Sequence, residues 1–112
     1  MGENMYTYII ECIDGSLYTG VATDVIKRMR EHLGIEKGGA KYTKTRPPVA
    51  IRAVWESENR SSASKLEFYV KKLTRAEKLQ LIATFNLSLI PQIDSALYTL
   101  KSEYIGQISL NS

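Results

Sequence analysis

Tyrosine, arginine and histidine side chains occur at spacings that could bring them to one site. Tyr8 and Tyr18 lie in two segments rich in β-branched residues, and Arg28 and His32 follow, four residues apart. A phenol can act as a base or a nucleophile, an arginine can stabilise negative charge, and an imidazole can transfer a proton near neutral pH. These groups would be most useful if they converged on one concave, solvent-accessible surface.

The two tyrosines belong to segments that are predicted to form a β-hairpin. Residues 5–12 and 16–21 flank Asp14-Gly15, a common hairpin turn. A two-residue turn would leave the tyrosines on opposite faces of the sheet. A three-residue loop with a left-handed Gly15 would put them on the same face. The sequence slightly favours the shorter turn, whereas a shared site requires the longer loop.

A helix should present the arginine and the histidine. Its cap is Thr23 or Asp24, and it is predicted to run to about Leu33. Arg28 and His32 are one turn apart and therefore share a face. The buried stripe of this helix is expected to be formed by Ile26, Met29 and Leu33.

The middle of the chain is predicted to contain one more strand and two more helices. Residues 34–48 have the composition of a basic loop, and residues 49–55 alternate as a third strand. Ser61 or Ser62 is expected to cap the second helix. A capping box at residues 74–77 should start the third helix.

The C-terminal part is predicted to add a last helix. Beyond Pro91, apolar residues recur at helical spacing; they are Ile93, Ala96, Leu97, Leu100 and Tyr104. The order of elements predicts an α+β domain with a small three-stranded, mainly antiparallel sheet flanked by helices. We expect residues 1–86 to form this domain and residues 87–112 to form a helical extension and tail, which could bind a second copy or another protein.

Composition limits the class of protein. The chain has 112 residues with 44% hydrophobic content, which suits one compact core. A single cysteine and the lack of a signal-like or membrane-length apolar segment predict a cytoplasmic protein. Residues 37–86 carry eleven Lys or Arg against four Asp or Glu, a net charge of +7, and the remainder carries −4. A basic section suits nucleic acid, although a solvated basic face has the same composition.

Several motifs follow one another in a recognisable order. They are Tyr6-Thr7-Tyr8, Leu17-Tyr18-Thr19-Gly20, and the stretches at residues 14–20, 38–43 and 71–79. Over residues 6–83 the chain resembles the GIY-YIG nuclease family, in particular its small stand-alone bacterial members. Tyr6-Thr7 replaces the glycine and isoleucine of the first motif. Larger members also keep an asparagine or similar polar group near the reacting phosphate, with which neither Asn59 nor Asn86 can be aligned.

The resemblance implies a role for each residue of the candidate site. Tyr8 would activate the attacking water or attack directly, and Tyr18, Arg28 and His32 would complete the catalytic group. Ionising a tyrosine at neutral pH costs about 4 kcal/mol, so its neighbours must assist. Glu67 would hold a single Mg²⁺ or Mn²⁺, whose other ligands are water and phosphate oxygens. If Ser64 capped its helix, Glu67 would merely close a capping box.

Simpler interpretations exist for most of these side chains. Tyr8 and Tyr18 could be packed strand residues, Arg28 could pair with Asp24, and His32 could be a solvated residue at a helix end. Glycine at position 20 would let a phosphate approach the backbone. The residues expected to contact nucleic acid are Gly20, Lys37, Lys41, Tyr42, Lys44 and Arg46, and a solvated loop is the alternative for the last five.

Two functions are therefore considered. The resemblance implies a metal-dependent endonuclease that hydrolyses DNA, with DNA repair or recombination as its setting. The alternative is a non-catalytic nucleic-acid-binding module that retains the fold. Joint presence of the tyrosines, Arg28, His32 and Glu67 favours catalysis, because binding alone needs only the lysines.

Overall fold

The computed structural model describes residues 4–35, 37–38 and 41–108, with the side chains of Lys41 and Tyr42 outside the description. The first elements are β1 (Met5–Cys12), β2 (Leu17–Ala22), α1 (Val25–His32), α2 (Lys41–Thr45), β3 (Pro48–Ser57), α3 (Arg60–Lys71) and α4 (Arg75–Thr84). The 3₁₀ turns η1 (Leu87–Leu89), η2 (Ser95–Leu97) and η3 (Ser102–Tyr104) follow, together with the short strands β4 (Thr99–Leu100) and β5 (Gly106–Gln107).

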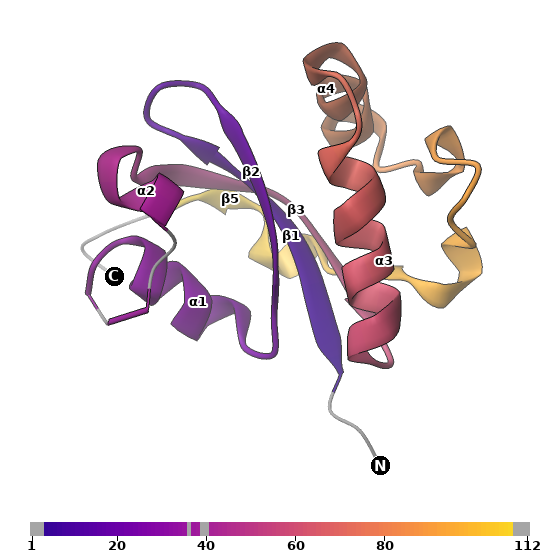
Figure 1. Cartoon of the computed structure of the whole chain (residues 1–112), viewed down its shortest axis with the longest axis horizontal. Helices are drawn as coiled ribbons and strands as arrows, with labels where there is room; N and C mark the ends of the chain where they lie inside the picture. The colour runs from indigo at the N-terminus through magenta and orange to yellow at the C-terminus, as the bar shows by residue number, and fades with distance from the viewer. Residues whose placement is uncertain (1–3, 36, 39–40, 109–112) are drawn as a thin grey trace.

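The sheet is antiparallel and lies between two layers of helices. Its strand order is β2-β1-β3-β4, and β5 also pairs with β3. Figure 1 shows α1 on one side of the sheet and α3 on the other. The predicted α+β class is confirmed, with two short strands more than expected.

The β1–β2 hairpin has the longer of the two loops considered. The backbone N–H of Cys12 donates to the carbonyl oxygen of Ser16 at 2.9 Å, and Gly15 is left-handed with φ of +84°. In this register Ile10 lies opposite Tyr18. Tyr8 and Tyr18 therefore lie on the same face, as a shared site requires.

Each face of the sheet has its own apolar core. Tyr8 and Ile10 pack with Val25 and Met29 of α1. The opposite face packs against α3 and α4 through a larger cluster that includes Ile9, Ala53, Trp55, Leu66, Val70 and Leu81. The site tyrosines thus belong to the layer that contains α1.

The buried face of α1 differs from the prediction. Its buried residues are Val25, Met29 and His32, whereas Ile26 is 57% exposed and Leu33 is only partly buried. The prediction of a stripe through Ile26 and Leu33 was wrong because it counted apolar residues alone. A polar side chain can occupy the core when its hydrogen bonds are satisfied there.

Local capping explains where the helices begin. Asp24 caps α1, as expected. Asn59 caps α3 by accepting from the backbone N–H of Ser62 at 2.8 Å, so the prediction of Ser61 or Ser62 as the cap was wrong. The capping box at residues 74–77 is present. The expected basic loop also contains a short helix, α2.

The predicted C-terminal helix is wrong. The backbone N–H of Lys101 donates to the carbonyl oxygen of Val54 at 2.8 Å, and that of Ile108 donates to the carbonyl oxygen of Val49 at 2.9 Å. The open edge of β3 thus takes up backbone groups that a helix would have used internally. The helix suggested for a partner or a dimer does not form, and the boundary at residue 86 stays a prediction. Among the described residues, no helix has the length and apolarity of a membrane span.

Candidate active site

Tyr8 lies at the centre of the candidate site. Its side chain is 0% exposed, and Gly20 is directly opposite on β2. A Cβ added to Gly20 would lie 2.6 Å from the ring carbon Cζ of Tyr8 and still closer to its hydroxyl oxygen. Gly20 therefore makes room for the phenol. The Tyr8 side chain fills the space that a Cβ at Gly20 would need, and approach of a phosphate to the Gly20 backbone stays a prediction.

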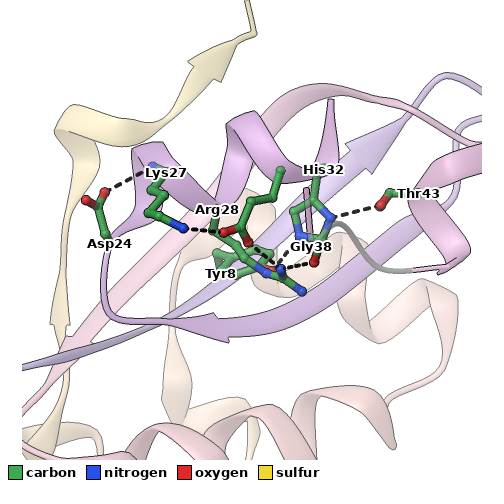
Figure 2. Close-up of polar contacts among 8 residues, drawn as sticks. Tyr8, Asp24, Lys27, Arg28, His32, Gly38 and Thr43 are labelled. Atoms are coloured by element: carbon green, nitrogen blue, oxygen red, sulfur yellow. Dashed lines mark hydrogen bonds and ion pairs between the residues drawn. The ribbon is translucent and has the colours of Figure 1, made fainter. Parts of the chain in front are cut away.

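Hydrogen bonds lead from the Tyr8 hydroxyl to α2. Its oxygen lies 2.7 Å from Nε2 of His32, and Nδ1 of His32 lies 2.9 Å from Oγ1 of Thr43 (Figure 2). His32 is 3% exposed and Thr43 is 1% exposed. The interpretation of His32 as a solvated helix-end residue is wrong, since both ring nitrogens have buried partners.

Tyr18 packs beside the same imidazole. The ring centroids of Tyr18 and His32 are 5.4 Å apart, and those of Tyr8 and His32 are 5.8 Å apart, both edge-to-face. Such contacts favour defined ring orientations. The two tyrosines and the histidine thus form one cluster, as predicted, but Tyr8 lies beneath the surface rather than on it.

Arg28 completes the cluster and is held by two acceptors. Its Nη1 lies 2.6 Å from Oε1 of Glu31 and 2.6 Å from the carbonyl oxygen of Gly38 (Figure 2). The positive charge of the guanidinium also acts on the Tyr8 hydroxyl and favours its ionised form. Arg28 pairs with Glu31 rather than with Asp24, which was the simpler interpretation.

Burial controls the protonation of the central pair. It raises the pKa of Tyr8 to about 12, although the hydrogen bond and charge of Arg28 act in the opposite direction. It lowers the pKa of His32 to about 4, and the Arg28 charge adds to this effect. Both side chains are therefore neutral near pH 7. His32 is not an imidazolium, and Tyr8 needs further positive charge nearby before it can lose its proton.

Glu67, on α3, influences the site through its charge. Its negative charge contributes to raising the pKa of Tyr8, and its Oε2 lies 3.3 Å from Nζ of Lys71. The alternative in which Ser64 caps the helix is wrong, because α3 already begins at Arg60. Glu67 is therefore a partly exposed carboxylate with a lysine partner, near the buried phenol.

Among the residues predicted to be catalytic, Glu67 is the carboxylate proposed to hold a metal ion. Nowhere in the described part of the chain do three or more His, Cys, Asp or Glu side chains gather around a possible ion. Glu67 fits Mg²⁺ or Mn²⁺ only if water and phosphate oxygens supply the remaining ligands, which is usual for Mg²⁺ at phosphate sites.

A family comparison agrees with this arrangement. Residues 4–80 match the family model of the GIY-YIG catalytic domain. The chain belongs to the GIY-YIG family. This match extends from the start of β1 into α4 and includes all five residues predicted to be catalytic.

Relatives of this GIY-YIG protein occur in bacteria and archaea. The UPF0213 protein BH0048 of Halalkalibacterium halodurans is 44% identical over 80 residues, which are 71% of this chain and 83% of that protein. A UPF0213 protein of Syntrophus aciditrophicus is 48% identical over 82 residues, covering 73% and 92%. One of Halobacterium salinarum is 44% identical over 73 residues, covering 65% and 92%. Their names state no activity.

A solved structure of a relative is also similar. It is the solution NMR structure of the UPF0213 protein BH0048 from Bacillus halodurans, with 44% sequence identity and a TM-score of 0.47. The similarity covers 71% of this chain and 83% of that chain.

The basic residues expected to contact nucleic acid differ in their surroundings. Lys37 and Lys44 line a cavity of about 740 Å³ whose wall also includes His32. Nε of Arg46 lies 3.1 Å from Oδ2 of Asp14 in the hairpin loop. The side chains of Lys41 and Tyr42 lie outside the described part of the structure. Contact of these residues with nucleic acid stays a prediction.

Two polar residues of the site were not found from the sequence. Glu31 holds Arg28, and its position three residues further along the helix was an available signal. Thr43 binds His32 from another helix, and no local pattern indicates that contact. Asn59 and Asn86, considered for the late asparagine of the family, instead cap α3 and η1.

Proposed function

We propose that this GIY-YIG protein is an endonuclease that hydrolyses DNA phosphodiester bonds with a single Mg²⁺ or Mn²⁺. The observation that supports this most is the environment of one hydroxyl group. Nε2 of His32 lies 2.7 Å from the Tyr8 hydroxyl oxygen, and the charges of Arg28 and Glu67 both act on this group. A module that only binds nucleic acid has no need for a histidine, an arginine and a carboxylate around one phenol.

Arg28 is suited to bind the reacting phosphate. A guanidinium can donate to two phosphate oxygens at once. In the resting site, the carboxylate of Glu31 and the carbonyl oxygen of Gly38 take these donors. Phosphate oxygens would replace both acceptors when DNA binds. The Glu31 carboxylate thus occupies, in the resting site, the position at which we expect the phosphate.

Tyr8 is the group proposed to activate the attacking water. Its raised pKa means that the neutral phenol predominates until DNA and metal bind. A divalent ion at Glu67 would supply positive charge close to Tyr8 and would polarise the scissile phosphate. Neutral His32 would accept a hydrogen bond from the Tyr8 O–H, so the lone pairs of the phenol oxygen would point away from the imidazole.

The biological setting that we propose is DNA repair or recombination, with DNA as the partner. The family assignment supports nucleic acid as the substrate class, and the net charge of +7 on residues 37–86 is favourable for its binding. We retain residues 1–86 as the proposed nuclease unit.

A cleavage assay tests the proposal. Labelled single-stranded, duplex and branched DNA would be incubated with the protein in Mg²⁺, Mn²⁺ or EDTA. We expect cleavage in Mg²⁺ or Mn²⁺ and none in EDTA. Arg28→Ala should reduce the rate by about 10²-fold or more. Arg28→Lys should restore little of it, because lysine keeps the charge but lacks the two parallel donors of the guanidinium. Tyr8→Phe should fold and fail to cleave. Cleavage by Tyr8→Phe at the wild-type rate would exclude the phenol as the activating group.

A non-catalytic nucleic-acid-binding module is the second candidate. Complete burial of Tyr8 and occupation of Arg28 by Glu31 and Gly38 favour it, because a resting enzyme usually exposes its reactive group. Binding of DNA without cleavage under every metal condition would decide for this candidate.

A further inference from the structure

Three polar side chains form a hydrogen-bonded chain, and the charge of Arg28 indicates its direction. The guanidinium is always positive and acts on the Tyr8 oxygen, so the lone pairs of that oxygen face Arg28 and its O–H points away. The O–H of Tyr8 then donates to Nε2 of His32 at 2.7 Å. Nε2 is therefore unprotonated, and a neutral His32 carries its proton on Nδ1. That N–H donates to Oγ1 of Thr43 at 2.9 Å.

We infer, on the basis of the proposed function, that Thr43 is a positioning residue that holds His32 in the Nδ1–H tautomer. In that tautomer Nε2 accepts the Tyr8 proton. The remaining lone pair of the phenol oxygen then faces Arg28 and the side on which a phosphate would bind. Thr43 acts through His32 and does not itself contact the reacting atoms.

Burial makes this control strict. His32 and Thr43 are 3% and 1% exposed, so water cannot readily replace a lost partner. Without the Thr43 hydroxyl, a buried Nδ1–H would lack an acceptor, which is unfavourable. The imidazole would then favour the Nε2–H tautomer, whose proton would compete with Arg28 for the Tyr8 oxygen and leave the Tyr8 O–H without an acceptor.

A spectroscopic test is straightforward because His32 is the only histidine in the chain. The ¹⁵N chemical shifts of its two ring nitrogens report the tautomer at neutral pH. We expect a protonated Nδ1 and an unprotonated Nε2 in the wild-type protein. Thr43→Val should lose this pattern and reduce cleavage about 10- to 100-fold, as other changes to partners that orient a histidine do. Thr43→Ser keeps a hydroxyl and should retain both properties.

Thr19→Val is a matched control. Thr19 is also buried, on β2, and its Oγ1 has no hydrogen-bond partner within the described residues. The same substitution there should leave the His32 tautomer and the cleavage rate unchanged. If Thr43→Val does not fold, Thr43→Ala against Thr43→Ser provides the comparison.

Several results would overturn the inference. They are a protonated Nε2 in the wild type, an unchanged tautomer in Thr43→Val, and full cleavage by a Thr43 variant whose tautomer has changed. The tautomer is measured without any substrate. A wild-type protein that cleaves no nucleic acid would therefore reject the proposed function, while the NMR result would still decide whether Thr43 sets the tautomer.

Discussion

Gly20 offers the sharpest test of how the site is packed. Changing a strand glycine with ordinary backbone angles to alanine usually increases the stability of the protein, by about 0.4–1 kcal/mol. Here the new Cβ would lie 2.6 Å from Cζ of Tyr8, closer than van der Waals contact allows. Tyr8 cannot move freely, because its hydroxyl is hydrogen-bonded to His32 and its ring is buried.

The expected cost of Gly20→Ala follows from these terms. Overpacking a core costs about 1–3 kcal/mol. Displacing the Tyr8 hydroxyl from His32 adds about 1 kcal/mol for the lost hydrogen bond. After the usual gain is subtracted, we expect a net loss of about 2 kcal/mol in the free energy of unfolding. This corresponds to a decrease of about 10 °C in Tm for a domain of this size.

Urea unfolding followed by tryptophan fluorescence would measure this loss. Trp55 is the only tryptophan and is buried in the core, so its emission reports global unfolding. The matched background is Tyr8→Leu, which removes the ring that the new methyl group would meet. In that background the cost of Gly20→Ala should disappear. A Gly20→Ala protein as stable as the wild type, or an equal cost in both backgrounds, would refute the contact between Tyr8 and Gly20 as the cause.

Three further predictions concern the metal, the histidine and the basic residues. Glu67→Gln should abolish metal-dependent cleavage while DNA binding in EDTA is kept, whereas Lys71→Ala, which removes only the partner of Glu67, should still cleave. The pKa of His32 is about 4 in the folded protein against 6.5 in the unfolded chain, so the unfolded state binds its proton first as the pH falls. The contribution of neutral His32 to the free energy of unfolding should be complete above pH 6.5 and should be lost between pH 6.5 and 4, by at most about 3 kcal/mol. Urea titrations of His32→Gln should not show this loss. Lys37 and Lys44 would be changed to alanine in the Glu67→Gln protein. The slope of log K against log salt for duplex DNA should then decrease by about 0.9 per lost phosphate contact. An unchanged slope would show that neither lysine contacts a phosphate.

Elements defined by local interactions could be predicted from the sequence. The hairpin strands, the Asp24 cap and the capping box at residues 74–77 depend on neighbours within a few positions. The C-terminal helix was predicted wrongly because local spacing does not decide its structure. Its helical spacing was real, but residues near Lys101 gain more by pairing with the open edge of β3, which lies about fifty positions earlier in the chain.

The hairpin illustrates the limit of local information. Asp14-Gly15 is compatible with both loops, and the sequence slightly favoured the wrong one. The longer loop lets Tyr8 lie opposite Gly20, with Tyr18 on the same face, where both rings contact His32. Packing between β1, β2 and α1 therefore selects the register, because a change of one residue would move every side chain to the other face.

Residue types and the order of the motifs are enough to propose Tyr8, Arg28 and Glu67 as the groups that carry the chemistry. Their protonation and their contacts depend on how distant parts of the chain pack together. Burial makes Tyr8 and His32 neutral, and Thr43 from a separate helix supplies the acceptor that selects a tautomer. Protonation depends on solvent exclusion and on neighbours 24 positions apart, as for Tyr8 and His32, and no local pattern records either quantity.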